Sequence, residues 1–197
     1  MKKRILFVMG VWCSGKTTNF NYILSEYSDD VCYVPSYTTR DMREWEINGQ
    51  RYRHISADEF DTMIFNNERL EYASAPWVHR GKYYGTRKSD IDTVIAQDKI
   101  PIKETEVIGL HQLLNSQYAH EYEIITIFLN ISDDEMRKRI RLRQSDMSWE
   151  DIEQRILHTQ HERDFAQQYC TYIVDASPAL SIVQSRLRQI MDAILEK

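Results

Sequence analysis

The sequence predicts an α/β fold in which a parallel sheet is flanked by helices and interrupted by a small mixed α+β insert. Short apolar runs alternate with amphipathic stretches along the 197 residues, as strands and helices do in such folds. The run at residues 123–129 is β-branched and apolar on both faces, which is typical of a strand in the middle of a parallel sheet. A glycine-rich motif lies between the first apolar run and the first amphipathic stretch.

That motif, residues 10–17, fits the phosphate-binding loop pattern G-x-x-x-x-G-K-[ST] at every specified position. Residues 4–9 before it predict a buried strand, and the amphipathic stretch from Thr18 predicts a helix. A glycine-rich turn without a ligand is the plainer alternative, and the flanking strand and helix disfavour it. The glycines let backbone N–H groups close around phosphate oxygens, Lys16 can reach the β- and γ-phosphates, and Thr17 offers a hydroxyl to Mg²⁺. We therefore predict a P-loop NTPase fold and an ATP site formed by Gly10, Ser14, Gly15, Lys16, Thr17 and Thr18.

The next segments predict a second strand and the insert. Residues 31–34 read as a buried strand, and the alternation over 50–55, after the Asn48-Gly49 turn, predicts short antiparallel strands. Ser56 and Glu59 have the spacing of a capping box, which predicts that a helix begins there.

The C-terminal half repeats the alternation of strands and helices. We expect a helix around 91–95, a strand at 100–102, and a helix after the cap at 132–135 that breaks at 144–149. Another helix follows to about residue 168, then a strand at 172–174 and a closing helix, whose candidates for the buried face are Leu187, Ile190 and Ile194. The chain contains no internal repeat, so we expect one domain: a core of about 1–34 and 90–197, with an insert at about 35–89.

Composition narrows the classes of partner. A net charge of -5 disfavours a nucleic-acid-binding surface, which needs clustered positive charge. Three widely separated cysteines, Cys13, Cys32 and Cys170, suit reduced thiols and show no metal-ligand spacing. The basic start followed by an apolar run imitates a secretory signal, but cleavage would discard the phosphate-binding motif. We expect a cytoplasmic protein without a membrane span, either a monomer or a homodimer.

The insert contains a second ordered set of residues. They are Ser36-Tyr37-Thr38-Thr39-Arg40, Arg43, Glu46, Asn48-Gly49, Tyr52, Glu59-Phe60, Met63-Ile64, Glu71 and Gly81-Lys82-Tyr83-Tyr84-Gly85-Thr86. From the phosphate loop to about Gly85, in unbroken order, the sequence resembles the guanylate kinase family, and it does so more loosely to the C-terminus. The resemblance implies an ATP-dependent enzyme, with Mg²⁺ as cofactor, that phosphorylates GMP or dGMP.

The resemblance also implies roles for individual residues. Arg40, Arg43, Tyr52 and Tyr84 would hold the GMP phosphate, and guanidinium groups do bind such oxygens in pairs. Glu71 would accept the guanine N1–H and N2–H donors, with Ser36 and Thr86 as hydroxyl partners of the base. Taken singly, each of these residues also fits a surface charge or a packed aromatic ring.

A third group resembles the mobile lid of nucleoside monophosphate kinases, at about residues 139–155. Arg139 and Arg143 are four residues apart and so share one helix face. With Arg155 they would close over the phosphates, and with Lys16 and Arg40 they complete the catalytic set that we expect. A basic, solvated helix is the alternative.

The sequence departs from the family pattern in three places. Glu104-Thr105-Glu106 stands where members usually have Asp-x-Asp, so Glu104 and Glu106 would contact GMP, its phosphate or metal-bound water with altered spacing. Gln144 replaces a usual glycine in the lid, and the loop between Glu71 and Tyr84 is longer, with Pro76 and Trp77 inside it. These departures leave two alternatives open: a kinase for another nucleoside monophosphate or a sugar phosphate, and a non-catalytic binding module.

Overall fold

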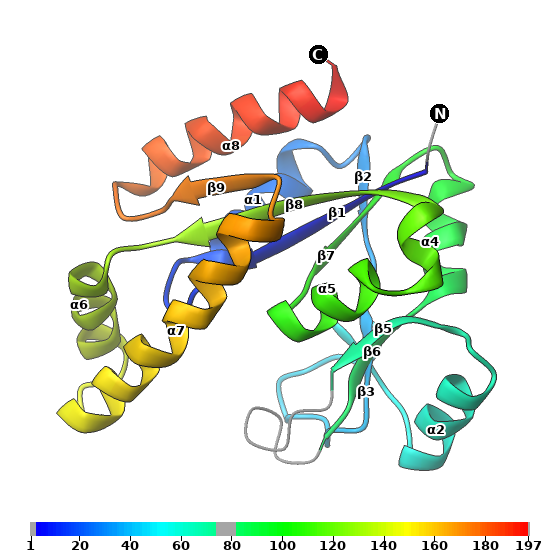
Figure 1. The fold of residues 1–197 in the computed structure, drawn as a ribbon, viewed down its shortest axis with the longest axis horizontal. Coiled ribbons are helices and arrows are strands. Elements are labelled where there is room, and N and C mark those ends of the chain that lie inside the picture. The colour runs from blue at the N-terminus through cyan, green and yellow to red at the C-terminus, as the bar shows by residue number, and fades with distance from the viewer. Residues whose placement is uncertain (1–2, 74–81, 197) are drawn as a thin grey trace. The chain divides into compact units, whose positions relative to one another are not determined.

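The computed structural model describes residues 3–73 and 82–196, and Figure 1 shows their strands and helices in chain order. Pro76, Trp77 and Gly81, which the sequence singled out, lie outside the described residues. The elements are β1 (Lys3–Gly10), α1 (Lys16–Glu26), β2 (Val31–Tyr33), β3 (Ser36–Thr38), β4 (Tyr52–His54), α2 (Ala57–Phe65), β5 (Arg69–Ala73), β6 (Tyr84–Arg87), α4 (Lys88–Ile95), β7 (Ile100–Glu104), α5 (Val107–Leu114), the 3₁₀ turn η1 (Gln117–His120), β8 (Tyr122–Asn130), α6 (Asp133–Arg143), α7 (Trp149–Tyr169), β9 (Tyr172–Asp175) and α8 (Leu180–Leu195).

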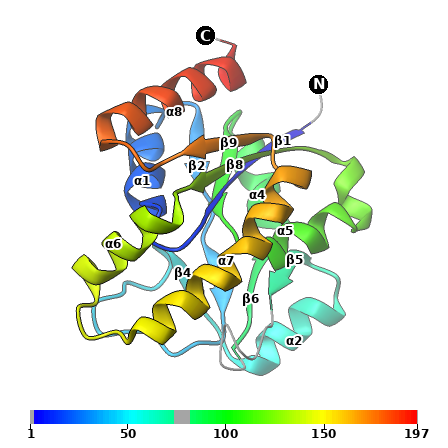
Figure 2. The ribbon, with the colours of Figure 1, turned by 60° about the vertical axis from the view of Figure 1, so that its left-hand side comes forward.

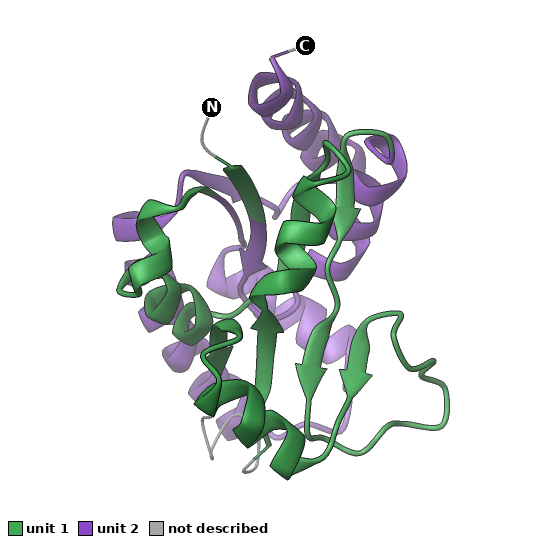
Figure 3. Cartoon of the chain, turned by 90° about the vertical axis from the view of Figure 1, so that its right-hand side faces the viewer, with its two compact units in different colours: residues 1–6, 29–124 green, residues 7–28, 125–197 purple. Residues whose placement is uncertain are grey.

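The chain divides into two compact units, which Figure 3 colours separately. Unit 1 comprises residues 1–6 and 29–124, and unit 2 comprises residues 7–28 and 125–197. The larger sheet has the strand order β2-β7-β1-β8-β9, and β1 and β8 each contribute residues to both units. The predicted alternation of strands and helices is confirmed.

Unit 1 contains a four-stranded mixed sheet in the order β4-β3-β6-β5. β6 pairs antiparallel with both β3 and β5, and places Thr86 opposite Glu71. The predicted antiparallel pairing around residues 50–55 is wrong, because β4 runs parallel to β3 with Ser36 opposite Tyr52. The Asn48-Gly49 turn does form, but residues 39–51 act as the connection of about a dozen residues that a parallel pair needs.

Helix α2 packs its apolar side under this small sheet. Its capping box is present as predicted: the Ser56 hydroxyl accepts from the Glu59 amide, and the Glu59 carboxylate accepts from the Ser56 amide. The helix buries Phe60 and Met63 in a cluster with Tyr37. Phe60 also stacks on Tyr83, with their ring centroids 5.2 Å apart.

Two further strands that lie wholly in unit 1, β2 and β7, pair in parallel. The predicted strand at 100–102 extends to Glu104 and is buried over its first four residues. Helix α4 packs on β7, and α5 packs on β5. The sequence reading did not anticipate β3, β5, β6 or α5 as separate elements.

Unit 2 is organised around β8, the clearest strand of the sequence. Its residues 125–129 are buried, and it lies between β1 and β9 in the strand order, which confirms the predicted interior position. β9 runs parallel to it, with Ile127 opposite Tyr172 and Asn130 opposite Asp175. Just before β9 begins, Thr171 is joined to Thr126 of β8 by two hydrogen bonds, in which each backbone N–H donates to the hydroxyl of the other residue, at 3.2 and 2.7 Å.

Helices α1 and α8 of unit 2 lie side by side (Figure 2). Of the three residues predicted for the buried face of α8, Leu187 and Ile194 are buried, whereas Ile190 is only partly buried. Tyr27, which follows α1, donates a hydrogen bond of 2.8 Å to the Asp192 carboxylate. α6 and α7 also pack on one another, and both begin at a serine cap, Ser132 and Ser148.

Helix α2 provides a matched pair of phenylalanines that tests this packing. Phe60 is fully buried, whereas Phe65 on the same helix is 90% exposed. We expect Phe60→Ala to lower the free energy of unfolding by about 3–5 kcal/mol, because it leaves a cavity between α2 and the sheet. Phe65→Ala should change it by less than about 0.5 kcal/mol. Urea denaturation checks both, and equal losses for the two variants would contradict the described core.

Candidate active site

The phosphate-binding motif forms a tight turn between β1 and α1 in unit 2. Gly15 caps α1 in the left-handed conformation with φ 78°, and Cys13 is also left-handed with φ 60°. Helix α1 has no side-chain cap and no acidic residue in its first turn. Its first N–H groups and its positive end are therefore left to an anion.

Close packing around the loop explains why residue 10 is a glycine. A Cβ on Gly10 would come within 2.7 Å of the Leu129 carbonyl oxygen and 2.8 Å of Ser14 Oγ. Ser14 Oγ is buried and has no hydrogen-bond partner among the described residues. A buried hydroxyl of this kind costs free energy unless it is paired, so the loop is built for a polar ligand.

The three residues that begin α1 lie where the motif predicts. Lys16 is partly exposed, while Thr17 and Thr18 are exposed at the end of the helix. Asn19 is buried one step further and donates a hydrogen bond of 3.1 Å to the Gly15 carbonyl. All six residues of the predicted ATP site thus lie in one turn and the first residues of α1.

Three arginines of α6 and α7 gather at this loop, all within unit 2. Arg139 donates to the Cys13 carbonyl at 3.3 Å, and the Arg155 guanidinium lies 4.2 Å from the centre of the Trp12 ring. Arg143 hydrogen-bonds the Cys13 thiol. Burial raises the pKa of this thiol, and the charges of the three arginines oppose that rise. The structure therefore brings the predicted lid arginines together at the phosphate loop.

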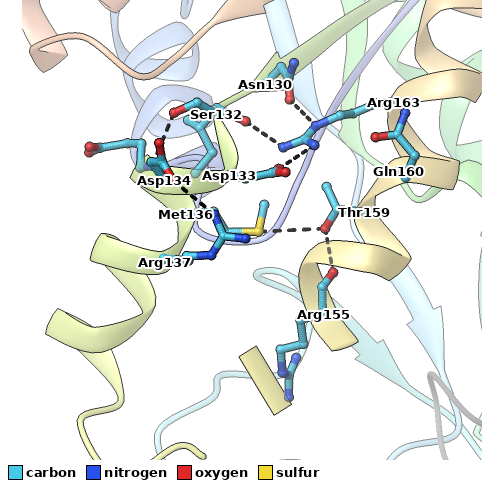
Figure 4. A network of polar contacts seen from close by, with 12 residues as sticks. Asn130, Ser132, Asp133, Asp134, Met136, Arg137, Arg155, Thr159, Gln160 and Arg163 are labelled. Atoms are coloured by element: carbon cyan, nitrogen blue, oxygen red, sulfur yellow. Dashed lines mark hydrogen bonds and ion pairs between the residues drawn. The ribbon is translucent and has the colours of Figure 1, made fainter. Parts of the chain in front are cut away.

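Arg163 holds α7 against the end of β8 and the start of α6 (Figure 4). Its guanidinium donates to the Asn130 side chain at 3.0 Å, to the Asp133 carboxylate at 2.6 Å and to the Ile131 carbonyl at 2.8 Å. Only 15% of its side chain is exposed. This three-way clamp fixes the helices that carry the lid arginines, and the sequence analysis did not single it out.

The predicted phosphate-binding residues of unit 1 centre on Arg40. Its guanidinium donates twice to the Glu46 carboxylate, at 2.7 and 3.0 Å, and lies 5.2 Å from the centre of the Tyr52 ring. Tyr52 in turn meets Tyr84 edge to face, with centroids 5.9 Å apart. The hydrogen bond from Arg40 lowers the pKa of the Glu46 carboxyl to about 2, so Glu46 is ionised at neutral pH.

Arg43 differs from Arg40 in its surroundings. Its backbone N–H donates to Glu46 at 2.9 Å, but its guanidinium lies over the ring of Trp45, 5.6 Å from the centroid. Glu46 therefore joins both arginines, one through the side chain and one through the backbone. His54 also contacts Arg40, because its Nδ1 lies 2.7 Å from the Arg40 carbonyl oxygen.

The predicted base-reading residues form a polar cluster in unit 1, in which Ser36 is only partly buried. Glu71 and Thr86 are both buried, and the Thr86 hydroxyl donates to the Glu71 carboxylate. Ser36 accepts a hydrogen bond of 2.6 Å from the ammonium group of Lys103. Lys103 was missed in the sequence, although a lysine that continues the apolar run 100–102 is a signal that could have found it.

Glu104 and Glu106 lie at the end of β7 and the beginning of α5. Glu104 pairs with Arg51 at 3.1 Å, and Glu106 is the N-cap residue of α5. Burial raises the pKa of Glu71, the charge of Glu106 raises it further, and Lys103 and Thr86 oppose the rise. Both glutamates are thus close to the base-reading cluster in the fold, with Glu106 coupled to it electrostatically.

Comparison with known proteins decides the family. A family model described as guanylate kinase matches residues 2–193. The chain belongs to the guanylate kinase family. Curated relatives include the guanylate kinase of Porphyromonas gingivalis, 31% identical over 153 residues that cover 78% of either chain. The guanylate kinase of Mycoplasmopsis pulmonis is 33% identical over 147 residues, which cover 74% of this chain and 73% of the relative.

A solved structure supports the fold of this guanylate kinase family member. The crystal structure of guanylate kinase from Anaplasma phagocytophilum matches with a TM-score of 0.68 at 19% identity, covering 100% of this chain and 88% of that chain. The predicted P-loop NTPase fold is thereby confirmed. Among the helices of the described part of the chain, none combines the length and apolar character that crossing a membrane demands.

One departure from the guanylate kinase pattern has a simple physical account. Gln144, which replaces a usual glycine, caps the end of α6 with φ -141° and ψ 76°. Because φ is negative there, the backbone does not need glycine. The backbone N–H of Gln144 ends the helix by donating a hydrogen bond of 2.8 Å to the Ile140 carbonyl.

The Arg163 clamp predicts an effect on stability. Lysine keeps the charge but lacks the planar fork, so Arg163→Lys should lose at least one of the three hydrogen bonds. We expect the free energy of unfolding to fall by about 2–3 kcal/mol, measured by urea denaturation. Arg186→Lys is the matched control: Arg186 also donates to a carbonyl, that of Asp175 at 2.7 Å, but its side chain is 44% exposed. That change should cost less than about 1 kcal/mol, and an equal cost for both would refute the clamp.

Proposed function

We propose that the chain transfers the γ-phosphoryl group of ATP to GMP or dGMP, giving ADP and GDP or dGDP. The family and the names of its relatives support a nucleotide kinase of this kind. The observation that carries the choice of acceptor is the buried Glu71 carboxylate, fixed by the Thr86 hydroxyl. A fixed carboxylate can accept from both guanine N1–H and N2–H, whereas adenine has no N1–H to offer.

The donor-side residues support the transfer step. The amides of the loop and the start of α1 would bind the ATP phosphates, with Lys16 placing its charge on the β- and γ-phosphates. Arg139, Arg143 and Arg155 would offset the negative charge that moves during transfer. An oxygen of the acceptor phosphate attacks the γ-phosphorus while the bond to the β-phosphate oxygen breaks, so no protein nucleophile is needed.

Mg²⁺ fits the residues at the phosphate loop. This ion prefers oxygen ligands and commonly takes only one or two of them from the protein, with the rest from phosphates and water. Thr17 is exposed at the start of α1, three residues after Ser14, whose buried hydroxyl has no hydrogen-bond partner among the described residues. We propose that Thr17 holds Mg²⁺, which would neutralise phosphate charge when bound.

On the acceptor side, Arg40 and its neighbours support a phosphate site. Glu46 holds the Arg40 guanidinium in one orientation, and the Tyr52 and Tyr84 rings pack around it. We propose that Arg40, Arg43, Tyr52 and Tyr84 bind the GMP phosphate, and that Ser36, Thr86, Glu104 and Glu106 complete the acceptor site with Glu71.

ADP release tests the proposed function directly. Purified protein is assayed with ATP, Mg²⁺ and each of GMP, dGMP, AMP, CMP, UMP and ribose bisphosphate. We expect GMP or dGMP to give the highest kcat/KM, and Lys16→Ala to lower kcat by at least about 10²–10³-fold, because it removes charge aimed at the reacting phosphates. Lys99→Ala, at a partly exposed lysine before β7, is the control. A preference for another acceptor would redirect the assignment, and wild-type turnover by Lys16→Ala would remove the catalytic role of the loop.

Glu71→Gln tests how the acceptor base is read. The amide keeps the size of the side chain but replaces one acceptor oxygen by a donor, which faces a guanine donor. A buried mismatch of this kind costs about 1–3 kcal/mol, or roughly ten- to a hundred-fold in kcat/KM for GMP. The KM for ATP should stay unchanged, and AMP should gain relative to GMP.

The control for this variant is Glu68→Gln. Glu68 lies just before β5, pairs with Arg87 at 3.2 Å and is 39% exposed in its side chain. It should leave the ratio of GMP to AMP turnover unchanged. If Glu71→Gln uses GMP as efficiently as the wild type does, guanine is read by other residues.

A further inference from the structure

Lys103 is a buried cation that the proposed reaction does not use. It continues the apolar run of β7 between Ile102 and Glu104, and only 1% of the residue is exposed. Lysine is almost never buried to this extent without charged or hydrogen-bonded partners, because an unpaired buried ammonium is costly. Its partners therefore indicate why the fold keeps it.

The partners of Lys103 are one hydroxyl and three carboxylates, all in unit 1. Its Nζ donates to Ser36 Oγ at 2.6 Å, a short distance that suits a charge-assisted hydrogen bond. Burial lowers the pKa of the Lys103 ammonium group, and the charges of Glu71, Glu104 and Asp90, which lie on β5, β7 and α4, oppose that fall.

Among the described residues, Glu104 and Asp90 each have an arginine partner as well, whereas Glu71 has Lys103 as its cation. Glu104 pairs with Arg51 at 3.1 Å, and Asp90 pairs with Arg53 at 2.6 Å. Glu71 receives the Thr86 hydroxyl instead, and Lys103 is the cation whose charge acts on it. Lys103 thus touches Ser36 directly and Glu71 electrostatically, the two residues that would read the acceptor base.

The ammonium fixes the direction of the hydrogen bonds in this cluster. Because an ammonium group can only donate, Ser36 Oγ must accept from Lys103, which leaves the serine O–H proton free to donate to a ligand. Thr86 donates its own proton to Glu71, so its oxygen can only accept from a ligand. The cluster therefore offers a donor at Ser36 and acceptors at Glu71 and Thr86.

This arrangement of one hydrogen-bond donor and two acceptors is complementary to one class of purine. A 6-keto-2-amino purine presents an acceptor at O6 and donors at N1–H and the 2-amino group, which is complementary at every position. A 6-amino purine presents a donor at position 6 and an acceptor at N1, so it would place donor against donor at Ser36 and leave Glu71 facing the N1 lone pair. A mismatch of buried polar groups is strongly disfavoured.

We propose that Lys103 is a specificity-determining positioning residue: by donating to Ser36 and balancing Glu71, it sets the cluster to accept 6-keto purine nucleotides. The inference rests on the proposed function, in which Ser36, Glu71 and Thr86 face the acceptor base. It adds a residue and a physical cause for the selection.

The charges around Glu71 give the inference a consequence that depends on pH. Burial raises the pKa of Glu71, the nearby Glu106 at the start of α5 raises it, and Lys103 on β7 and Thr86 on β6 lower it. Removing Lys103 therefore moves the pKa of Glu71 upward. Since only the ionised carboxylate accepts from both base donors, binding of the acceptor would then weaken at a higher pH than in the wild type.

Lys103→Met removes the charge while keeping an unbranched side chain of similar length. With ATP saturating, we expect the KM for GMP to rise by about ten- to a hundred-fold while kcat changes by less than about three-fold. The ratio of kcat/KM for GMP to that for AMP should fall by about ten-fold or more. IMP, which has the 6-keto group but no 2-amino group, should lose efficiency in parallel with GMP. The KM for ATP should not move, and Lys99→Met is the matched control.

A pH profile separates this role from a purely structural one. Between pH 5 and 8, the KM for GMP of Lys103→Met should begin to rise at a higher pH, on acidification, than that of the wild type. A looser fold alone would not shift this midpoint. Should Lys103→Met fail to fold, Lys103→Met combined with Glu71→Gln removes both buried charges, and it should fold with its preference for GMP over AMP lost.

The outcomes distinguish this inference from the proposed function. Wild-type protein that neither binds nor phosphorylates GMP would overturn both. Wild-type GMP kinase activity, with an unchanged GMP-to-AMP ratio and pH profile in folded Lys103→Met, would overturn the role of Lys103 alone. Retained GMP preference in the double variant would show that this cluster does not read the base, and it would overturn both the role of Lys103 and the reading of guanine by Glu71.

Discussion

The donor side of this molecule depends on the close approach of the phosphate loop to β8. Val11 donates its backbone N–H to the Leu129 carbonyl at 3.1 Å, and a side chain at Gly10 would collide with that same oxygen. The loop can reach this position only because Gly10 has no Cβ and Gly15 adopts a left-handed conformation. The chain leaves β8 directly into α6, whose Arg139 donates back to the Cys13 carbonyl. The backbone of the loop is therefore hydrogen-bonded both to the backbone of β8 and to an arginine side chain of α6.

The acceptor side in unit 1 is organised by charge pairing instead. Arg40 is held by Glu46, Arg51 by Glu104 and Arg53 by Asp90. Each pair fixes a guanidinium or a carboxylate in one orientation, which reduces the entropy that a bound nucleotide would otherwise have to remove. Arg40 shows the cost of this arrangement, because the proposed phosphate would have to share a guanidinium that Glu46 already occupies. An arginine with five donors can serve both, whereas a lysine could not present the same fork.

The features that the sequence predicted well are those with short, fixed spacing. The phosphate loop, the capping box of α2 and the strand at 123–129 each depend on residues within one turn or one strand, so their pattern is complete in the local sequence. The parallel pairing of β3 with β4 was predicted wrongly, because local alternation carries no information about the direction of the partner strand. Arg163 and Lys103 were missed for a related reason. Their partners lie tens of residues away, at Asn130 and at Ser36.

The longer side chain of Glu104 shows how the departures from the family pattern become part of the fold. Its carboxylate reaches Arg51, at the start of β4, with an ion pair of 3.1 Å. The Arg51 carbonyl in turn accepts from the Tyr33 hydroxyl at 2.9 Å and from the Ser36 amide at 3.2 Å. Glu104 therefore links β7 to Arg51, and the Arg51 carbonyl in turn holds Ser36 at the start of β3. Ser36 is also the serine that accepts from Lys103. An aspartate, shorter by one methylene, would have to move the backbone of β7 or Arg51 to make the same contact. The glutamate thus supports the position of Ser36, so the extra methylene would contribute to the geometry of the proposed acceptor site.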